Sequence, residues 1–352
     1  MLKRINNLKN EYFSRFTDFN NCTTFTIHSF LNLKIHSFYT NFHDVFQRVL
    51  FYFTGKTLKK PEKQASLYIL PGLLFRENLN PVPNDRLILK YSGVVSNNIP
   101  FEYYEAPDHD LAVVNKDTHI IFNFEGKEAI VFLHEKHAKP MNFFVVQCVL
   151  IPILSEFLRE ENVYMIHSSA VSKQGRGIVI VGKGGVGKTT VSIHCVKNGF
   201  KFLGDDLVFL SETNEKAVLF SFPIPVHIKF DTLKYFPELD MLSRTPFQNT
   251  NEKQFFRVDK IFKDSIIDQA SPFLMLFPEF NDNNSHKIEE ISRIEAFKRL
   301  ISNSMYVTNP ERSRNHFEIL NTIIESVKLY KLKIGKDLKG LSDILSRLAQ
   351  DG

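Results

Sequence analysis

The sequence predicts a mixed α/β fold (α+β) in which a central mixed sheet carries a phosphate-binding loop. A Gly-rich motif stands between an apolar β-like run at 178–181 and an amphipathic segment at 188–198. β-like runs and helical segments then alternate to the C-terminus, a pattern typical of sheets covered by helices. The chain has 352 residues, a length that suggests about two domains.

The amino-acid composition indicates a globular protein and disfavours several other classes. Hydrophobic residues make up 43% and charged residues 24%, which are globular proportions. The cysteines, Cys22, Cys148 and Cys195, are scattered, which disfavours a disulfide scaffold or a zinc ribbon and fits a reducing compartment. Apolar runs stay well short of the ~20 residues that span a bilayer, and the N-terminus lacks the apolar core of a secretory signal. We therefore expect a cytoplasmic protein.

The net charge of +5 is unevenly placed. Residues 1–65 hold ten Lys and Arg against four Asp and Glu, whereas the remainder is nearly neutral. A broad basic surface is therefore not expected, and no nucleic-acid partner is predicted.

Three segments are expected along the chain. Residues 1–63 are predicted to form a basic, aromatic, helical segment, and residues 64–160 a small mixed β module that ends in a helix at 140–160. Residues 161–352 are predicted to form the P-loop domain. The β-like runs of the module lie at 87–91, 101–104, 119–124 and 128–133.

The first segment contains one clear helical face. Its apolar residues recur at i, i+3, i+4, i+7, i+8 and i+11. They are Phe42, Val45, Phe46, Val49, Leu50 and Phe53. The favoured interpretation is a helix packed on the body of the protein. The alternative is that residues 39–54 lie on a membrane or dock on a partner.

In the P-loop domain, strands are predicted at 163–167 and 177–181, a helix at 188–198, and Gly199 in the left-handed position after that helix. Further strands are predicted at 200–203, 207–210, 226–230, 255–258, 273–277 and 329–334. Further helices are predicted at 293–302, 314–327 and 338–349.

The Gly-rich motif fits G-x-x-x-x-G-K-[ST] completely. The predicted nucleotide-binding residues are Gly182, Lys183, Gly184, Gly185, Val186, Gly187, Lys188, Thr189 and Thr190. Glycines allow backbone N–H groups to turn inward around phosphates, and the helix presents its positive N-terminus to the same anion. Lys188 is expected to reach the β- and γ-phosphates and the Thr189 hydroxyl to ligate Mg²⁺. The motif therefore predicts binding of ATP and Mg²⁺.

Two carboxylates and a histidine are predicted near the loop. Asp205 and Asp206 follow the strand at 200–203, and His167 ends the strand at 163–167. If these are neighbouring parallel strands, their carboxyl ends meet at the edge where ligands bind. One carboxylate could then face Mg²⁺ and the other an acceptor hydroxyl, with His167 orienting a carboxylate or tuning its basicity. The simpler interpretations are a solvated turn for the aspartates and a core histidine for His167.

These motifs together resemble the catalytic domain of the HPr kinase/phosphorylase family, whose sheet topology is shared with phosphoenolpyruvate carboxykinase. The resemblance rests on His-Ser-Ser-Ala-Val at 167–171, the P-loop, and Gly-Asp-Asp at 204–206, and covers about residues 163–212. It implies an ATP-dependent kinase that phosphorylates a serine-type hydroxyl on a peptide, a protein or a small molecule. It also implies oligomeric assembly.

The same resemblance implies roles for individual residues. Asp205 resembles the general base, Asp206 the metal-side carboxylate and His167 the partner that supports the base. Arg257 stands where the family uses an arginine from a later loop. Lys183 departs from the family, which usually has a small or acidic residue there. With no counterpart to the family's C-terminal signature or N-terminal domain, the chain resembles a specialised relative that modifies peptides or free serine.

Two other classes of protein share part of this pattern. The loop also resembles the P-loop of the ParA/MinD ATPases, in which an early lysine, here Lys183, reaches across a dimer. Against this, about 180 residues precede the loop, and the following strand leads to Gly-Asp-Asp instead of D-x-D-P. The third candidate is a nucleotide-binding regulator without transferase activity.

Overall fold

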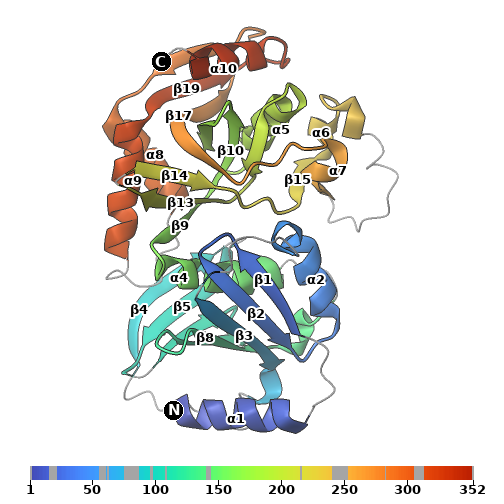
Figure 1. Ribbon diagram of the computed structural model, residues 1–352, viewed down its shortest axis with the longest axis vertical. Coiled ribbons are helices and arrows are strands. Elements are labelled where there is room, and N and C mark those ends of the chain that lie inside the picture. The colour runs from blue at the N-terminus through green and yellow to red at the C-terminus, as the bar shows by residue number, and fades with distance from the viewer. Residues whose placement is uncertain are drawn as a thin grey trace. The chain divides into compact units, whose positions relative to one another are not determined.

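The structure is a computed structural model, which describes residues 2–15, 22–54, 61, 63–74, 87–95, 98–107, 109–139, 144–214, 216–239, 253–281, 283–304 and 313–350. The chain forms two compact units (Figure 1). The first contains residues 1–161 and 306–313, and the second contains 162–305 and 314–352. No helix among the described residues is long and apolar enough to cross a membrane.

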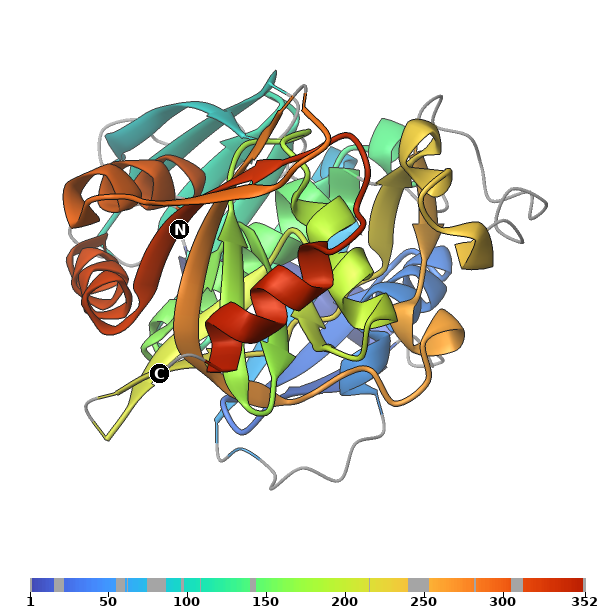
Figure 2. The same cartoon turned by 90° about the horizontal axis from the view of Figure 1, so that it is seen from above.

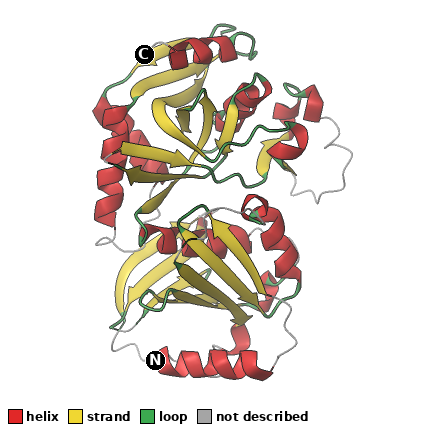
Figure 3. Cartoon of the chain, viewed as in Figure 1, coloured by secondary structure: helices red, strands yellow, loops and turns green. Residues whose placement is uncertain are grey.

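The first unit is built on an eight-stranded mixed sheet (Figure 3). Its order is β1-β2-β3-β8-β7-β6-β5-β4, in which β3 pairs in parallel with β2 and β8 and the other pairs are antiparallel. The strands are β1 (Cys22–Ile27), β2 (Leu31–Ser37), β3 (Gln64–Pro71), β4 (Ile88–Val95), β5 (Ile99–Glu105), β6 (Asp110–Val114), β7 (Thr118–Asn123) and β8 (Glu128–Leu133).

Residues 1–63 are not purely helical, because β1 and β2 belong to the same sheet as the strands of residues 64–160. In β2, Leu31, Leu33 and Ile35 are buried and alternate with polar residues. Such alternation marks a half-buried strand, and the parallel pairing of β2 with β3 joins the two predicted segments. The helical face that follows at 42–53 dominated the sequence pattern, so this strand pair was not predicted.

That helical face packs inside the first unit. Helix α2 (Asn41–Val49) is followed by a 3-10 turn, η1 (Phe51–Phe53). Phe42, Phe46, Leu50 and Phe53 are each at most 1% exposed. The helix therefore packs on the body of the protein, as the favoured interpretation expects. The alternative, docking on a membrane or partner through residues 39–54, would need this apolar face, and Phe42, Phe46, Leu50 and Phe53 on it are covered.

Other helices complete the first unit. Helix α1 (Leu2–Arg15) places Ile5 in a cluster with residues of β3, β7 and β8, and Lys9 Nζ lies 2.9 Å from the Glu128 carboxylate. The helix predicted at 140–160 is observed as a π-helix, η5 (Val145–Leu150), that continues into α4 (Ile151–Arg159). Residues 140–143 lie outside the described part.

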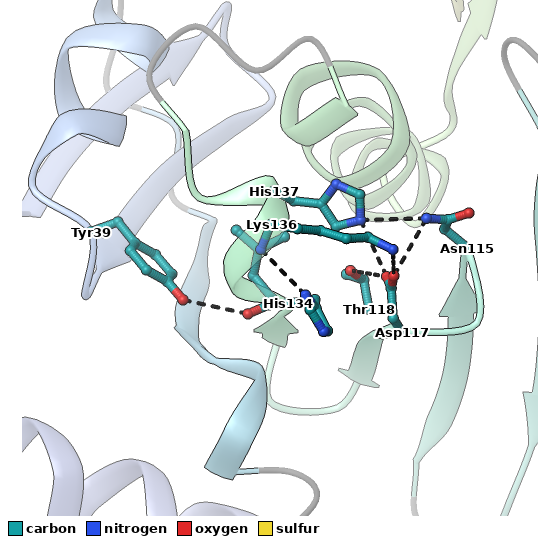
Figure 4. A network of polar contacts seen from close by, with 8 residues as sticks. Tyr39, Asn115, Asp117, Thr118, His134, Lys136 and His137 are labelled. Carbon is teal, nitrogen blue, oxygen red and sulfur yellow. Dashed lines mark hydrogen bonds and ion pairs between the residues drawn. The ribbon is translucent and has the colours of Figure 1, made fainter.

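A polar network holds one end of this sheet (Figure 4). The carboxylate of Asp117, in the β6–β7 turn, pairs with Lys136 and lies 3.2 Å from Nε2 of His137. Both partners belong to a short helix, η4 (Glu135–His137), that follows β8. The His137 ring stacks on Phe144, with 3.7 Å between centroids. These contacts tie the β6–β7 turn to the segment that leads into η5.

The second unit contains a nine-stranded sheet of order β12-β10-β11-β17-β14-β13-β9, in which β19 pairs with β17 and β18. Its strands are β9 (Val163–Ile166), β10 (Ser168–Lys173), β11 (Arg176–Val181), β12 (Lys201–Gly204), β13 (Val208–Thr213), β14 (Lys216–Phe220), β17 (Gln269–Phe280), β18 (Lys287–Glu290) and β19 (Lys328–Ile334). A separate two-stranded ribbon contains β15 (Val226–Lys229) and β16 (Lys253–Phe256). The fold class is therefore mixed α/β, as predicted.

Helices cover both faces of this sheet, and β17 lies between them. Its Leu274 and Leu276 are buried with residues of α5 and α10, and its Met275 and Phe277 are buried with residues of α8 and α9. Successive strand residues point to opposite faces, so this alternation gives two apolar cores. Figure 2 shows α10, in red, across one face. The helices are α5 (Lys188–Lys197), α6 (Phe230–Leu233), α7 (Val258–Ile261), α8 (Arg293–Ser304), α9 (Arg314–Ser326) and α10 (Leu341–Gln350).

The strands that carry the predicted site are not adjacent parallel strands. An unpredicted strand, β10, lies between β11 and β12 and is antiparallel to both. Strands β11 and β12 therefore run in the same direction, and their carboxyl ends share one edge with the amino end of β10. The register confirms this: Ser168 pairs with Val181, and Ala170 pairs with Gly204. The residues that follow β11 and β12 are thereby brought together at one edge.

Gly204 allows the tight turn after β12. A Cβ on Gly204 would lie 2.4 Å from the carbonyl oxygen of Leu207 and 3.1 Å from that of Phe222, and backbone atoms cannot move as easily as the end of a side chain. We expect Gly204→Ala to lower the free energy of unfolding by about 1–3 kcal/mol, the range of an overpacked site, as measured by chemical denaturation. Gly184→Ala is the control, because its Cβ would meet nothing within 4 Å. Equal stability of the two variants would contradict the close approach at Gly204.

Candidate functional site

The predicted P-loop, residues 182–190, connects β11 to α5 and takes the conformation that its glycines permit. Gly185 and Gly187 have φ of +86° and +104°, in the left-handed region that favours glycine. A Cβ on Gly182 would lie 2.7 Å from Cγ2 of Val186, across the turn. Gly187 is the N-cap of α5 and provides no side chain to cap it, so the first N–H groups of the helix remain available to an anion. Thr190, in the first turn, is buried.

Lys188 extends into the loop that precedes it. Its side chain is 5% exposed, and its Nζ donates to the carbonyl oxygens of Gly182 at 2.6 Å and Lys183 at 3.3 Å. The same ammonium lies 3.4 Å from Nε2 of His167, in the link between β9 and β10. The Lys183 side chain is exposed. The charge of Lys188 is thus held against the turn of the loop, where a P-loop binds phosphates.

Asp205 is the buried carboxylate of the site, with 2% of its surface exposed. Its Oδ2 accepts a hydrogen bond from the Thr189 hydroxyl at 2.8 Å, and its Oδ1 accepts one from the Ser169 hydroxyl. Burial, followed by the neighbouring charge of Asp206, raises the pKa of Asp205 to about 7, although both hydroxyl bonds and Lys188 oppose the rise. A carboxyl group with a pKa near neutrality suits general acid–base catalysis.

His167 lies between Lys188 and the second carboxylate. Burial, and then the charge of Lys188, lower the pKa of His167, while the charge of Asp206 and a hydrogen bond to its backbone raise it. The net direction is downward from 6.5, so the ring is neutral at pH 7. Asp206 has φ of +66° and is partly exposed. The neutral ring therefore connects the P-loop lysine to the turn that carries both aspartates.

The structure brings together five of the residues predicted from the sequence. His167, Lys188, Thr189, Asp205 and Asp206 converge at the shared edge of β10, β11 and β12. These residues are far apart in the sequence. Strand β10 brings them together because it pairs with both β11 and β12, and it also places Ser169 beside Asp205.

Arg257, the arginine predicted for the site, directly follows β16 of the β15–β16 ribbon. Its guanidinium donates to both carboxylate oxygens of Asp259, at 3.0 and 2.6 Å. In the ribbon, Val226 pairs with Phe256 and Lys229 pairs with Lys253, so Arg257 follows the end opposite to Lys229. Lys229, at the other end of the ribbon, lies beside the loop: its Nζ is 4.0 Å from the position of a Cβ on Gly185.

Ser169 and Lys229 were therefore missed by sequence reasoning. Ser169 belongs to the His-Ser-Ser-Ala-Val stretch at 167–171 on which the resemblance rests, but no role was assigned to it. Lys229 ends a short strand and carries no motif. Only the pairing of distant segments places either residue at the loop.

The oxygen atoms at this edge fit a magnesium ion carried by a nucleotide. Mg²⁺ prefers oxygen ligands and is usually bound by one or two protein groups together with phosphates and water. The Thr189 hydroxyl and the Asp205 carboxylate, 2.8 Å apart, form such a donor pair. Within the described part of the chain, no group of three His, Cys, Asp or Glu side chains could hold a metal by itself.

The raised pKa of Asp205 predicts a pH-dependent stability of the nucleotide-free, metal-free protein. The unfolded carboxyl loses its proton near 3.8, whereas the folded one keeps it to about 7. The folded state therefore binds more protons in this window, and Asp205 makes the protein less stable as pH rises through it. Thermal unfolding of the wild type and Asp205→Asn from pH 4 to 8 should show the wild type losing stability relative to the variant.

His167 contributes with the opposite sign, because its lowered pKa favours the folded state as pH rises toward 6.5. It is present in both proteins, so the difference between the two curves isolates Asp205. Parallel curves would show that the pKa of Asp205 is not raised.

Comparison with known proteins gives limited matches. No family model matches the chain. A stretch of 71 residues is 34% identical to an HPr kinase/phosphorylase of Chlorobium phaeobacteroides (strain BS1), and this match covers 20% of the chain and 21% of that protein. The HPr(Ser) kinase/phosphatase from Coxiella burnetii has a TM-score of 0.28 and 13% identity, over 53% of the chain and 94% of that structure. The sequence match supports a distant relationship to HPr kinase/phosphorylase.

Proposed function

We propose that this protein is an ATP-dependent kinase that transfers the γ-phosphoryl group to a hydroxyl acceptor of serine type on a peptide, a protein or a small molecule. The observation that carries the proposal is the hydrogen bond between Thr189 of the P-loop and the buried Asp205, whose pKa is raised to about 7. A phosphate-binding loop and a group able to take a proton are thereby in direct contact. The match to an HPr kinase/phosphorylase supports the same activity.

The chain supplies mainly position and charge, which is what phosphoryl transfer requires. Lys188 and the N–H groups of the loop would bind the phosphates, and Lys229 would add a positive charge beside Gly185. Thr189 and a neighbouring carboxylate would hold Mg²⁺, which, when bound, neutralises charge on the phosphates. His167, as a neutral ring, leaves Lys188 charged and keeps its ammonium near the loop.

The two carboxylates divide the remaining roles. Our proposal keeps Asp205 as the base, because its pKa is near neutrality and it already accepts hydrogen bonds from hydroxyl groups. Asp206 would then be the metal-side carboxylate. The contact of Asp205 with Thr189 and its burial favour the reverse assignment, in which Asp205 holds the metal and the more exposed Asp206 faces the acceptor. The second experiment below separates the two.

The first experiment measures transfer from γ-labelled ATP with Mg²⁺ to cell-extract fractions of proteins, peptides and small molecules. We expect label in one fraction and a loss of about 100-fold or more in Asp205→Asn, the share of a general base, with ATP affinity retained. Lys188→Ala should weaken ATP binding itself. Slow phosphate release without an acceptor would favour a switch ATPase, and binding without turnover would favour a silent regulator.

The second experiment compares Asp205→Asn and Asp206→Asn for residual transfer as a function of Mg²⁺ concentration. A metal-side variant should need more Mg²⁺ and recover rate as the ion is raised, because the lost carboxylate weakens ion binding. A base variant should remain slow at saturating Mg²⁺. Recovery in Asp205→Asn but not in Asp206→Asn would establish the reverse assignment.

A further inference from the structure

We propose that Phe280 is the platform on which the base of the bound nucleotide stacks, an inference that rests on the proposed function. Phe280 is the last residue of β17 and is 64% exposed. Single exposed apolar residues are common on proteins and need no explanation by themselves. Phe280 differs because of what it touches and where it stands relative to the carboxylate pair.

The ring of Phe280 lies directly beside the end of the P-loop. A Cβ on Gly187 would be 3.3 Å from Cζ of Phe280 and 3.1 Å from Cδ1 of Ile334. Gly187 caps the N-terminus of α5, so the aromatic ring borders the helix end that would receive the phosphates. A ligand held by the loop therefore has an exposed aromatic ring at its margin.

The backbone of Phe280 is fixed by strand pairing. Phe280 pairs with the fully buried Ile334 of β19, and the N–H of Asn281 donates to the Ile334 carbonyl at 2.8 Å. Leu274 and Leu276 lie on the same face of β17 and are buried with residues of α5 and α10. Phe280 continues this row past the end of the apolar core, so a rigid strand presents the ring.

The order of the strands indicates how a bound nucleotide would lie along the edge of the sheet. Along the edge of the sheet, Asp205 follows β12, Ser169 is the second residue of β10, the P-loop follows β11, and Phe280 ends β17. If the γ-phosphate lies near Asp205, the phosphate chain crosses the loop toward β17. The base then reaches the side of the loop on which Phe280 is exposed.

A phenylalanine ring recognises a base by its flat face alone. Stacking tolerates every base, because each has a π-face, and Phe has no donor or acceptor to read base edges. The proposed platform should therefore strengthen binding of any nucleoside triphosphate over that of the bare phosphate chain. Its contribution should be absent for a ligand that has no base.

The experiment compares ATP with inorganic tripolyphosphate, each with Mg²⁺, by calorimetry on the full chain. We expect Phe280→Ala to weaken ATP binding by about 5- to 150-fold, the range of aromatic stacking on a base, and to leave tripolyphosphate binding unchanged. Phe280→Trp should retain ATP binding, because it keeps an aromatic face. Phe317→Ala is the control, since Phe317 lies on α9 and is 39% exposed, and it should change neither ligand.

Each other outcome overturns a stated claim. Unchanged ATP binding in Phe280→Ala would overturn the stacking platform while leaving the kinase proposal intact. Equal weakening of both ligands would show that Phe280 only shapes the loop through Gly187. If the wild type bound neither ATP nor tripolyphosphate, the nucleotide site itself would be wrong and the platform with it. ATP binding without phosphoryl transfer would overturn the kinase alone, because the comparison of ligands needs no turnover.

Discussion

The second unit depends on one constraint: a carboxylate must be buried at the point where three strand ends meet. Asp205 is 2% exposed, and hydroxyl groups from β10 and from the first turn of α5 both donate to it. A buried carboxylate without such partners is strongly disfavoured. Even with them its pKa rises to about 7, so the site holds a group that can exchange a proton near neutral pH. Gly204 allows the close turn that leads to Asp205, and Thr189 donates a hydrogen bond to its carboxylate.

The long strand β17 explains how this junction is kept in place. Its alternating residues enter two apolar cores, one with α5 and one with α8 and α9. Because the strand is packed from both sides, its C-terminal end is a rigid border of the P-loop: Pro278 lies 3.9 Å from the Cβ position of Gly182, and Phe280 lies beside Gly187. Binding elements at the edge of such a sheet lose little further freedom when a ligand arrives.

The first unit illustrates where local patterns mislead. The aromatic face of α2 has the spacing of a membrane or docking helix, yet it is buried within the unit. Amphipathic spacing indicates only that one side of a helix is apolar and does not indicate what covers that side. His28, which directly follows β1, packs its ring on Phe53 of the turn η1 that ends this face. The parallel pairing of β2 with β3 depends on residues about thirty positions away.

The Gly-rich loop, the helix behind it, the mixed α/β class and five converging residues can be predicted from the amino-acid sequence, because each follows from a local pattern of glycine, apolar spacing and charge. The pairing of distant segments places β10 between β11 and β12, Ser169 beside Asp205, Lys229 beside Gly185, and the Arg257 guanidinium on Asp259. It also placed Phe280 beside Gly187. Strand order and register arise from contacts between residues far apart in the chain, and a short segment has no means of specifying its distant partner.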